Sequence, residues 1–215
     1  MTSITRWSSA SDRRGRAEKE GGIAVRKLVY YVGVSLDGYI AGPDGEFDFF
    51  PLADDLAAWI TERYPETIPT HLRGRVGLAA DEPNRQWDTV VMGRGTYEPA
   101  RAMGVASPYA HLRQYVVSTA LSPVDDPNVE VVAGDPVALV RRLKQGSGSD
   151  IWLCGGGTLA GALVDEIDEL IIKSYPVVAG AGISAFTGAF RPTLFRPTGR
   201  REFGNGAQVT WLERL

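Results

Sequence analysis

A short stretch of the chain combines two glycines, an arginine and a threonine in a pattern suited to binding a phosphate group. From Asp88 to Ala102 a run rich in β-branched residues breaks at Gly93 and continues with helix-compatible residues, which predicts a strand, a tight turn and a helix start. Gly93 and Gly95 let the backbone approach a ligand, and Thr96 stands where we expect the helix cap, beside free N–H groups that attract phosphate. Arg94 can add a planar, always-charged fork to the same anion. The alternative is a plain strand-to-helix turn with a solvated arginine.

A second glycine-rich stretch lies further along the chain. The apolar run that begins at Asp150 predicts a strand, and it leads into three consecutive glycines and then a helix that includes Leu163. Backbone N–H groups at such a turn can receive a pyrophosphate. The residues that would line it are Gly155, Gly156, Gly157, Thr158 and Leu159. No lysine follows the glycines, so the stretch is not a P-loop. The alternative is that the glycines only permit close packing of helix against sheet.

Alternating strands and helices place these two turns in one fold. Besides the two strands already described, apolar runs predict strands at residues 27–34, 114–119, 129–132 and 169–175. Helical spacing or a cap followed by proline predicts helices at 52–64, 70–80 and 137–144, and a final hairpin is predicted around residues 204–206. The pattern indicates an α/β fold in three layers, with a mixed, mainly parallel central sheet, helices on both faces and a C-terminal antiparallel hairpin.

The first predicted strand ends in a long loop. Residues 35–45, Ser-Leu-Asp-Gly-Tyr-Ile-Ala-Gly-Pro-Asp-Gly, are too many and too rich in glycine for a hairpin connection. Long loops at strand ends usually carry function. Because the carboxyl ends of parallel strands meet at one edge of a sheet, we expect this edge to hold a crevice lined by both glycine turns and by Ser118 and Thr119.

These motifs resemble the dihydrofolate reductase-like family, and most closely its stand-alone members that are similar to the C-terminal reductase domain of riboflavin biosynthesis. Met92-Gly-Arg-Gly-Thr-Tyr-Glu98 is similar to the Met-Gly-Arg-x-Thr-x-Glu signature of the family. Residues 35–41 resemble its mobile active-site loop, and residues 159–170 resemble the riboflavin branch. The resemblance covers residues 27–215 and implies a dihydrofolate reductase-like reductase domain that uses NADPH as hydride donor.

The resemblance also implies which residues surround the reacting end of the cofactor. Val34, Ile40 and Ala41 would lie near the nicotinamide ring, whereas Asp37 would form a turn. Asp55, followed by Leu-Ala, matches the proton-relay acid of dihydrofolate reductase and is the candidate catalytic residue. The alternative for Asp55 is structural, because acidic residues stabilise the N-terminus of a helix through its dipole.

At the other end of the cofactor, the resemblance places the glycines at 155–157 beneath the phosphates. Ser118 and Thr119 would join Arg94 at the adenosine 2′-phosphate. The alternative is that both hydroxyls only form a turn after a strand.

Two positions depart from the riboflavin-pathway enzymes. Those enzymes carry a lysine four residues before the loop serine and a glutamate just before the glycines, where this chain has Tyr31 and Cys154. The substrate therefore stays open among small pterin-, pyrimidine- and sugar-like molecules. A second hypothesis is a non-catalytic NADP(H)-binding or sensor module of the same fold, and a third is a structural homodimer that no cofactor affects.

Composition excludes several other classes of function. A net charge of −3 gives no general attraction to nucleic acid or to anionic membranes, and no apolar run is long enough to span a membrane. Cys154 is the single cysteine, which fits a reducing cytoplasm, and with two histidines it makes a metal site improbable. Residues 1–26 are polar and lack hydrophobic spacing, so we expect a disordered tail there.

Overall fold

The strand β1 (Leu28–Val34) runs through the interior of an eight-stranded sheet, with β6 (Asp150–Gly155) and β7 (Glu169–Ser174) parallel to it on either side. The other strands of this sheet are β3 (Trp87–Gly93), β4 (Arg113–Val117), β5 (Val129–Val132), β9 (Phe195–Glu202) and β10 (Gln208–Arg214). In this computed structural model, which describes residues 25–215, the strand order is β5-β4-β3-β6-β1-β7-β10-β9. All pairings in this sheet are parallel except those that β10 makes with β7 and β9, so the predicted mixed, mainly parallel sheet with a C-terminal hairpin is confirmed.

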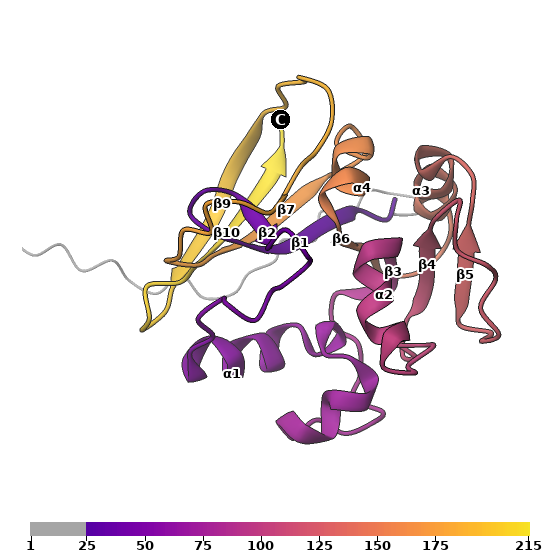
Figure 1. Ribbon diagram of the computed structural model, residues 1–215, viewed down its shortest axis with the longest axis horizontal. Coiled ribbons are helices and arrows are strands. Elements are labelled where there is room, and N and C mark those ends of the chain that lie inside the picture. Colours follow the sequence, from indigo (N-terminus) through magenta and orange to yellow (C-terminus); the bar gives the residue numbers. More distant parts are fainter. Residues whose placement is uncertain (1–24) are drawn as a thin grey trace, which may run out of the picture.

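Helices cover both faces of the sheet, as the sequence predicts (Figure 1). One face, called the α1 face below, packs against α1 (Asp54–Arg63) and α2 (Arg94–Ala102), with the 3-10 helices η1 (Pro65–Thr67) and η2 (Thr70–Val76) following α1. The opposite α4 face packs against α3 (Pro136–Gln145) and α4 (Gly157–Ala162). No helix in residues 25–215 has the length and apolar character needed to cross a membrane.

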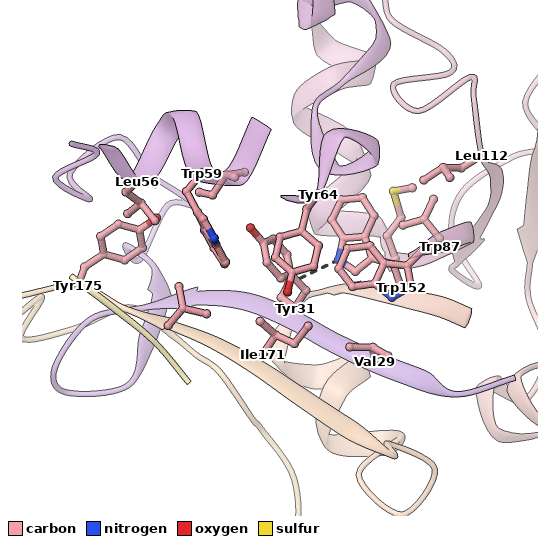
Figure 2. Packing of buried hydrophobic residues seen from close by; sticks show 14 of the residues in the cluster. Val29, Tyr31, Leu56, Trp59, Tyr64, Trp87, Leu112, Trp152, Ile171 and Tyr175 are labelled. Carbon is pink, nitrogen blue, oxygen red and sulfur yellow. Dashed lines mark hydrogen bonds between the residues drawn. The ribbon is translucent and has the colours of Figure 1, made fainter. Parts of the chain in front are cut away.

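The α1 face carries an aromatic core (Figure 2). The Tyr31 ring of β1 lies 5.0 Å from the Tyr64 ring and 5.5 Å from the Trp87 ring, measured between centroids. Its neighbour Tyr30 points the other way, into the core of the α4 face, because successive side chains of a strand alternate between faces. Burial on both faces explains why β1 is apolar almost throughout.

A second, two-stranded sheet joins the loop after β1 to a distant segment. In this sheet β2 (Tyr39–Ala41) pairs antiparallel with β8 (Ile183–Ser184). The sequence predicts only a loop and a turn at these places. Strands of three and two residues are too short to show the alternation that predicts a strand.

The fold begins before residue 27. Arg26 is only 4% exposed, and its guanidinium donates hydrogen bonds to the Thr89 hydroxyl at 2.7 Å, to the Asp88 carboxylate and to the Ser149 carbonyl oxygen. The sequence pattern places Arg26 in the predicted tail, because one arginine among polar residues carries no hydrophobic signal. The structure instead places it in the folded domain. Residues 1–24, the rest of the predicted tail, lie outside the described part of the chain.

Candidate active site

Four parallel strands bring the predicted phosphate-binding turns to one edge of the sheet. The strands β4, β3, β6 and β1 are neighbours in that order, and Gly93 of β3 is level with Val117 of β4. Met92 is level with Gly155 of β6. The turns that leave β3, β4 and β6, and the loop that leaves β1, therefore start at the same side of the sheet. This side is called the carboxyl edge below.

The turn after β3 lies directly against the turn after β6. A Cβ atom placed on Gly93 would be 3.7 Å from both the Gly155 carbonyl oxygen and the Gly156 nitrogen. The Thr96 hydroxyl oxygen is 3.7 Å from the Cβ position of Gly156. Thr96 is not the helix cap, because α2 starts at Arg94 with Gly93 as its N-cap, so this part of the prediction is wrong. As the third helical residue, Thr96 instead has its hydroxyl beside Gly155 and Gly156.

Arg94 and Gly95 open α2 at the carboxyl edge. The Arg94 side chain is 54% exposed, and its Nη1 atom lies 3.3 Å from Glu98 Oε1, one helical turn later. Within residues 25–215, no heavy atom outside its two chain neighbours and the nearby helix backbone lies within 4 Å of the Cβ position of Gly95. An exposed guanidinium beside an open glycine leaves space and charge for a phosphate group, so these residues fit a phosphate-bearing cofactor.

Ser118 and Thr119 follow β4 at the same edge. The Ser118 hydroxyl oxygen accepts hydrogen bonds from the backbone nitrogens of Ala120 at 3.1 Å and Leu121 at 3.0 Å. Ser118 therefore closes a local turn, while its hydroxyl hydrogen has no acceptor within residues 25–215. Thr119 is exposed. The Ser118 oxygen thus forms a turn, as the structural alternative proposes. Contact of the Ser118 or Thr119 hydroxyl with a 2′-phosphate stays a prediction.

The three glycines after β6 differ in what requires them. Gly155 has a φ angle of +125°, which favours glycine, and a cis peptide bond joins it to Gly156. A Cβ atom on Gly157 would lie 2.0 Å from the Ser184 carbonyl oxygen, so close packing excludes a side chain there. At Gly156 the nearest atoms lie 3.7 Å or more from the Cβ position. Gly156 is also half-buried whereas Gly155 and Gly157 are buried, so it is the most accessible glycine of the three.

The residues predicted near the nicotinamide gather at the end of β1. Val34, Ile40 and Leu159 all pack in the hydrophobic core of the α4 face. The Ile40 Cδ1 atom lies 3.8 Å from the Cβ position of Gly156, and Ala41 pairs with Ile183 in the small sheet. The structure thus brings the apolar residues of the loop together with the glycine turn. Thr158, the second residue of α4, is exposed.

Asp37 fixes the loop that leaves β1. Its carboxylate accepts hydrogen bonds from the Ser35 hydroxyl at 2.6 Å and from the backbone nitrogens of Ala179 at 3.0 Å and Gly180 at 2.7 Å. The Ser35 hydrogen bond, followed by the two backbone bonds, lowers the pKa of Asp37 to about 2. The ionised carboxylate holds two loops together, a role that fits the expectation of a turn-former.

The candidate proton donor, Asp55, is exposed in the first turn of α1. Its Oδ2 atom accepts a hydrogen bond from the Gly204 backbone nitrogen at 2.8 Å, and its Oδ1 atom accepts one from the Leu56 nitrogen at 2.9 Å. Both oxygens therefore bind backbone amides. These contacts support the structural alternative, and a part in proton transfer stays a prediction.

Sequence reasoning missed a charged residue of β7, Lys173. It is level with Gly33 of β1, and its Nζ atom lies 3.9 Å from the centroid of the Tyr31 ring. Lys173 is half-buried, and burial lowers its pKa to about 8. Its position gives the signal that could have found it, since Lys173 follows Ile171 by two residues and therefore shares the α1 face.

Two hollows in the surface include none of the predicted site residues. One has a volume of about 290 Å³ and lies between Tyr97 and Arg101 of α2 and the segment 122–125. The other has about 430 Å³ and lies between α1 and Leu78. Within residues 25–215 no group of three His, Cys, Asp or Glu side chains could hold a metal ion. The carboxyl edge, rather than either hollow, therefore brings the chemically suited residues together.

Known sequences match this chain over most of its length. Residues 26–209 match the RibD C-terminal domain family. "Uncharacterized protein YwjB" of Bacillus subtilis (strain 168) is 33% identical over 189 residues, which are 87% of this chain and 98% of that protein. "Uncharacterized protein YyaP" of the same organism is 26% identical over 184 residues, covering 84% of this chain and 91% of that protein.

Solved structures show the same fold. A putative riboflavin biosynthesis protein from Shewanella sp. PV-4 superposes with a TM-score of 0.65 at 22% identity, covering 88% of this chain and 99% of that chain. A diaminohydroxyphosphoribosylaminopyrimidine deaminase/5-amino-6-(5-phosphoribosylamino)uracil reductase from Thermotoga maritima gives 0.59 at 14% identity, covering 89% of this chain but 57% of that chain. By its sequence and its fold, this chain belongs to the RibD C-terminal domain family and has a dihydrofolate reductase-like fold.

Proposed function

We propose that this protein is an NADPH-dependent reductase that transfers a hydride to a small organic substrate. The observation that carries the proposal is the direct contact between the turns after β3 and β6 at the carboxyl edge, next to the exposed Arg94. Parallel sheets bind nucleotide-like ligands at such an edge. Membership of the RibD C-terminal domain family supports a reductase, because the Thermotoga maritima protein of the same fold is named as one.

The chain's own residues would hold the two ends of the cofactor differently. The open backbone at Gly95 and the half-buried backbone at Gly156 suit the pyrophosphate, and Arg94 suits the 2′-phosphate. Val34 and Ile40 offer an apolar wall for the nicotinamide ring and exclude water from one side of it. When bound, the reduced nicotinamide would supply the hydride, and the protein would fix its position against the substrate.

A non-catalytic NADP(H)-binding module is the second candidate, and one observation favours it. Asp55, the carboxylate that the resemblance offers as proton donor, is exposed and bound to two backbone amides. The module and the reductase share every cofactor contact, so they differ only in turnover. The predicted homodimer is independent of both, and sedimentation of the full chain would test it.

Thermal unfolding with and without nucleotide tests cofactor binding. NADPH at ~100 times its dissociation constant should add roughly 2.7 kcal/mol to the free energy of unfolding, because it binds the folded state only. A melting curve that millimolar NADPH leaves unchanged would exclude both the reductase and the non-catalytic NADP(H)-binding module. Slow oxidation of NADPH with a panel of pterins, pyrimidines, sugar-like compounds and quinones then separates them, since only the reductase consumes NADPH in a substrate-dependent way.

A further inference from the structure

Tyr30 lies between the glycine turn after β6 and the segment 184–187, which continues from β8. Its side chain is fully buried on the α4 face, and its hydroxyl donates a hydrogen bond to the Ala185 carbonyl oxygen at 3.0 Å. The same hydroxyl oxygen lies 4.0 Å from the Cβ position of Gly155. The Phe186 ring packs edge-on against the Tyr30 ring, 5.3 Å away between centroids. One side chain of β1 therefore contacts both the first glycine of the turn and the segment 184–187.

The segment 184–187 also lies directly on α4, the helix that follows the glycine turn. The Thr187 nitrogen donates a hydrogen bond to the Gly157 carbonyl oxygen at 3.0 Å. A Cβ atom on Gly161 would lie 2.0 Å from the Thr187 carbonyl oxygen, as close as one on Gly157 would lie to the Ser184 carbonyl oxygen. Glycine at both positions lets the segment approach the helix more closely than any side chain would allow. The turn, the start of α4 and this segment are therefore packed as one unit.

Ala185 joins this unit to β1 through both of its backbone groups. Its nitrogen donates to the Gly38 carbonyl oxygen at 3.0 Å, in the loop that leaves β1, while its carbonyl oxygen accepts from Tyr30. Burial raises the pKa of the Tyr30 hydroxyl above its usual value, so the group stays a donor throughout the neutral range. Removing this hydroxyl would break one of the two hydrogen bonds by which Ala185 is held.

The glycine turn depends on such contacts because it has no side chains of its own. Glycine loses more conformational freedom on ordering than any other residue, so the backbone at 155–157 keeps one conformation only where its neighbours fix it. A ligand binds more tightly to a turn that is already ordered, since binding then does not have to order it. Tyr30 on one side and the segment 184–187 on the other provide this support.

We infer that Tyr30 is a positioning residue that holds the glycine turn in the conformation that receives the cofactor's pyrophosphate. This inference rests on the proposed function, because it concerns the cofactor site of the reductase. Tyr30 is fully buried, so it acts on the ligand only through Gly155 and the segment 184–187. Its removal should therefore affect ligands that carry the pyrophosphate, whether or not they carry the nicotinamide.

Tyr30→Phe tests the inference by removing only the hydroxyl, and Tyr97→Phe is the matched control. The Tyr97 side chain is also fully buried, and its hydroxyl also donates to an alanine carbonyl oxygen, that of Ala106 beyond the C-terminal end of α2. Both variants lose an equivalent hydrogen bond, so overall stability should fall to a similar extent in each. Only Tyr30→Phe loses a contact with the glycine turn.

Isothermal titration calorimetry measures binding of NADPH and of 2′-phospho-ADP-ribose, which carries the pyrophosphate but lacks the nicotinamide. We expect Tyr30→Phe to weaken binding of both ligands about two- to tenfold. Loss of one hydrogen bond lowers the fraction of molecules with an ordered turn by about that factor, and the apparent affinity falls in proportion. Tyr97→Phe should leave both affinities unchanged.

Hydrogen exchange followed by nuclear magnetic resonance gives a second readout, which needs no nucleotide. The amide protons of Ala185 and Thr187 are bonded to Gly38 and Gly157, so they report on the segment 184–187. We expect both to exchange several-fold faster in Tyr30→Phe than in Tyr97→Phe, because only the former loosens this segment. The comparison between the two variants removes the effect of lower overall stability.

Three results would overturn the inference. They are unchanged nucleotide affinity in Tyr30→Phe, equal losses of affinity in the two variants, and equal exchange at Ala185 and Thr187 in both. Failure of the unsubstituted protein to bind NADPH would instead contradict the proposed function. The exchange rates would then still decide whether Tyr30 holds the segment 184–187 and the glycine turn.

Discussion

The Asp55 carboxylate accepts a hydrogen bond from the Gly204 backbone nitrogen, 2.8 Å away, and so joins the first turn of α1 to the hairpin between β9 and β10. The two residues are 149 positions apart in the chain. A residue that fastens a helix to a hairpin and a residue that relays a proton respond differently to substitution, so this contact leads to a direct test.

Replacing Asp55 by asparagine should lower stability and spare turnover. The asparagine amide has one acceptor oxygen and can keep only one of the two backbone hydrogen bonds, so we expect a loss of about 0.5–2 kcal/mol in unfolding free energy with little change in NADPH oxidation. Asp54→Asn is the control, since it removes the same charge from the same helix turn. A fall in turnover of ~10²-fold or more at unchanged cofactor affinity would instead identify Asp55 as the proton relay.

Two glycines of the carboxyl edge should respond oppositely to alanine. Gly157→Ala places a methyl group 2.0 Å from the Ser184 carbonyl oxygen, and such overpacking should cost about 1–3 kcal/mol or more. Gly95→Ala has open space in a helix, so unfolding free energy should hold or rise by up to about 1 kcal/mol. NADPH affinity should nevertheless fall in Gly95→Ala if the phosphates contact this turn. Chemical denaturation measures the change in stability, and nucleotide titration measures the change in affinity. Unchanged NADPH affinity would show that the phosphates do not contact Gly95.

The stability of the fold should decrease between pH 6.5 and pH 4 because of His111. Burial, with a further contribution from Arg73, lowers the pKa of His111 from 6.5 to about 4. Because the unfolded chain then takes up a proton before the folded chain does, unfolding free energy is constant above about pH 6.5 and falls as pH drops towards 4. The loss should be on the order of 2–3 kcal/mol, allowing for partial exposure of the ring.

The hydrogen bonds of His111 fit the neutral ring that burial favours, and the other histidine provides a control. One ring nitrogen, Nε2, is 2.9 Å from the Glu66 carbonyl oxygen and the other, Nδ1, is 2.9 Å from the Thr70 hydroxyl, which suits a neutral ring protonated at Nε2. His111→Gln should flatten the pH dependence of the unfolding free energy, measured by urea denaturation. Substitution of the exposed His71 should leave this pH dependence unchanged. An equal slope in both variants would show that carboxylates dominate the effect.

Local patterns predicted those parts of the fold that local interactions determine. Asp135 caps α3 by accepting a hydrogen bond from the Val137 nitrogen at 2.9 Å, and Pro136 is the first helical residue, as the cap-then-proline pattern indicates. The run of β5 at Val129–Val132 is likewise found where predicted. Both signals lie within a few residues of the structure they specify.

The features that sequence reasoning missed depend on contacts across long separations. The packing of Ser184 on Gly157 and the burial of Arg26 against Asp88 join residues that no local pattern relates. Lys173 was missed because a lysine in a strand is usually solvated, and only the adjacency of β1 and β7 places it over Tyr31. The resemblance located the carboxyl edge, but which glycine is open and which is packed required the structure.

Arg94 should select NADPH over NADH. The turns after β3 and β6 offer backbone amides for the pyrophosphate, which both cofactors share, so the exposed guanidinium is left for the 2′-phosphate that only NADPH carries. Arg94→Ala should weaken NADPH binding about ten- to hundredfold, because a charge-assisted contact is worth roughly 1.5–3 kcal/mol. NADH binding should stay nearly unchanged. The variant should also flatten the salt dependence of NADPH binding measured by fluorescence titration, since an accessible charge pair is screened.

Two further variants of α2 make the Arg94 test specific. Arg101→Ala removes the same charge from the last turn of the helix and should leave both affinities unchanged. Glu98→Gln removes the carboxylate that lies 3.3 Å from Arg94 and should strengthen NADPH binding by a few-fold at low salt, because the guanidinium then has one competitor fewer. Equal losses for NADPH and NADH in Arg94→Ala would place the guanidinium on the pyrophosphate, and no loss for either would leave Arg94 as a solvated surface residue paired with Glu98.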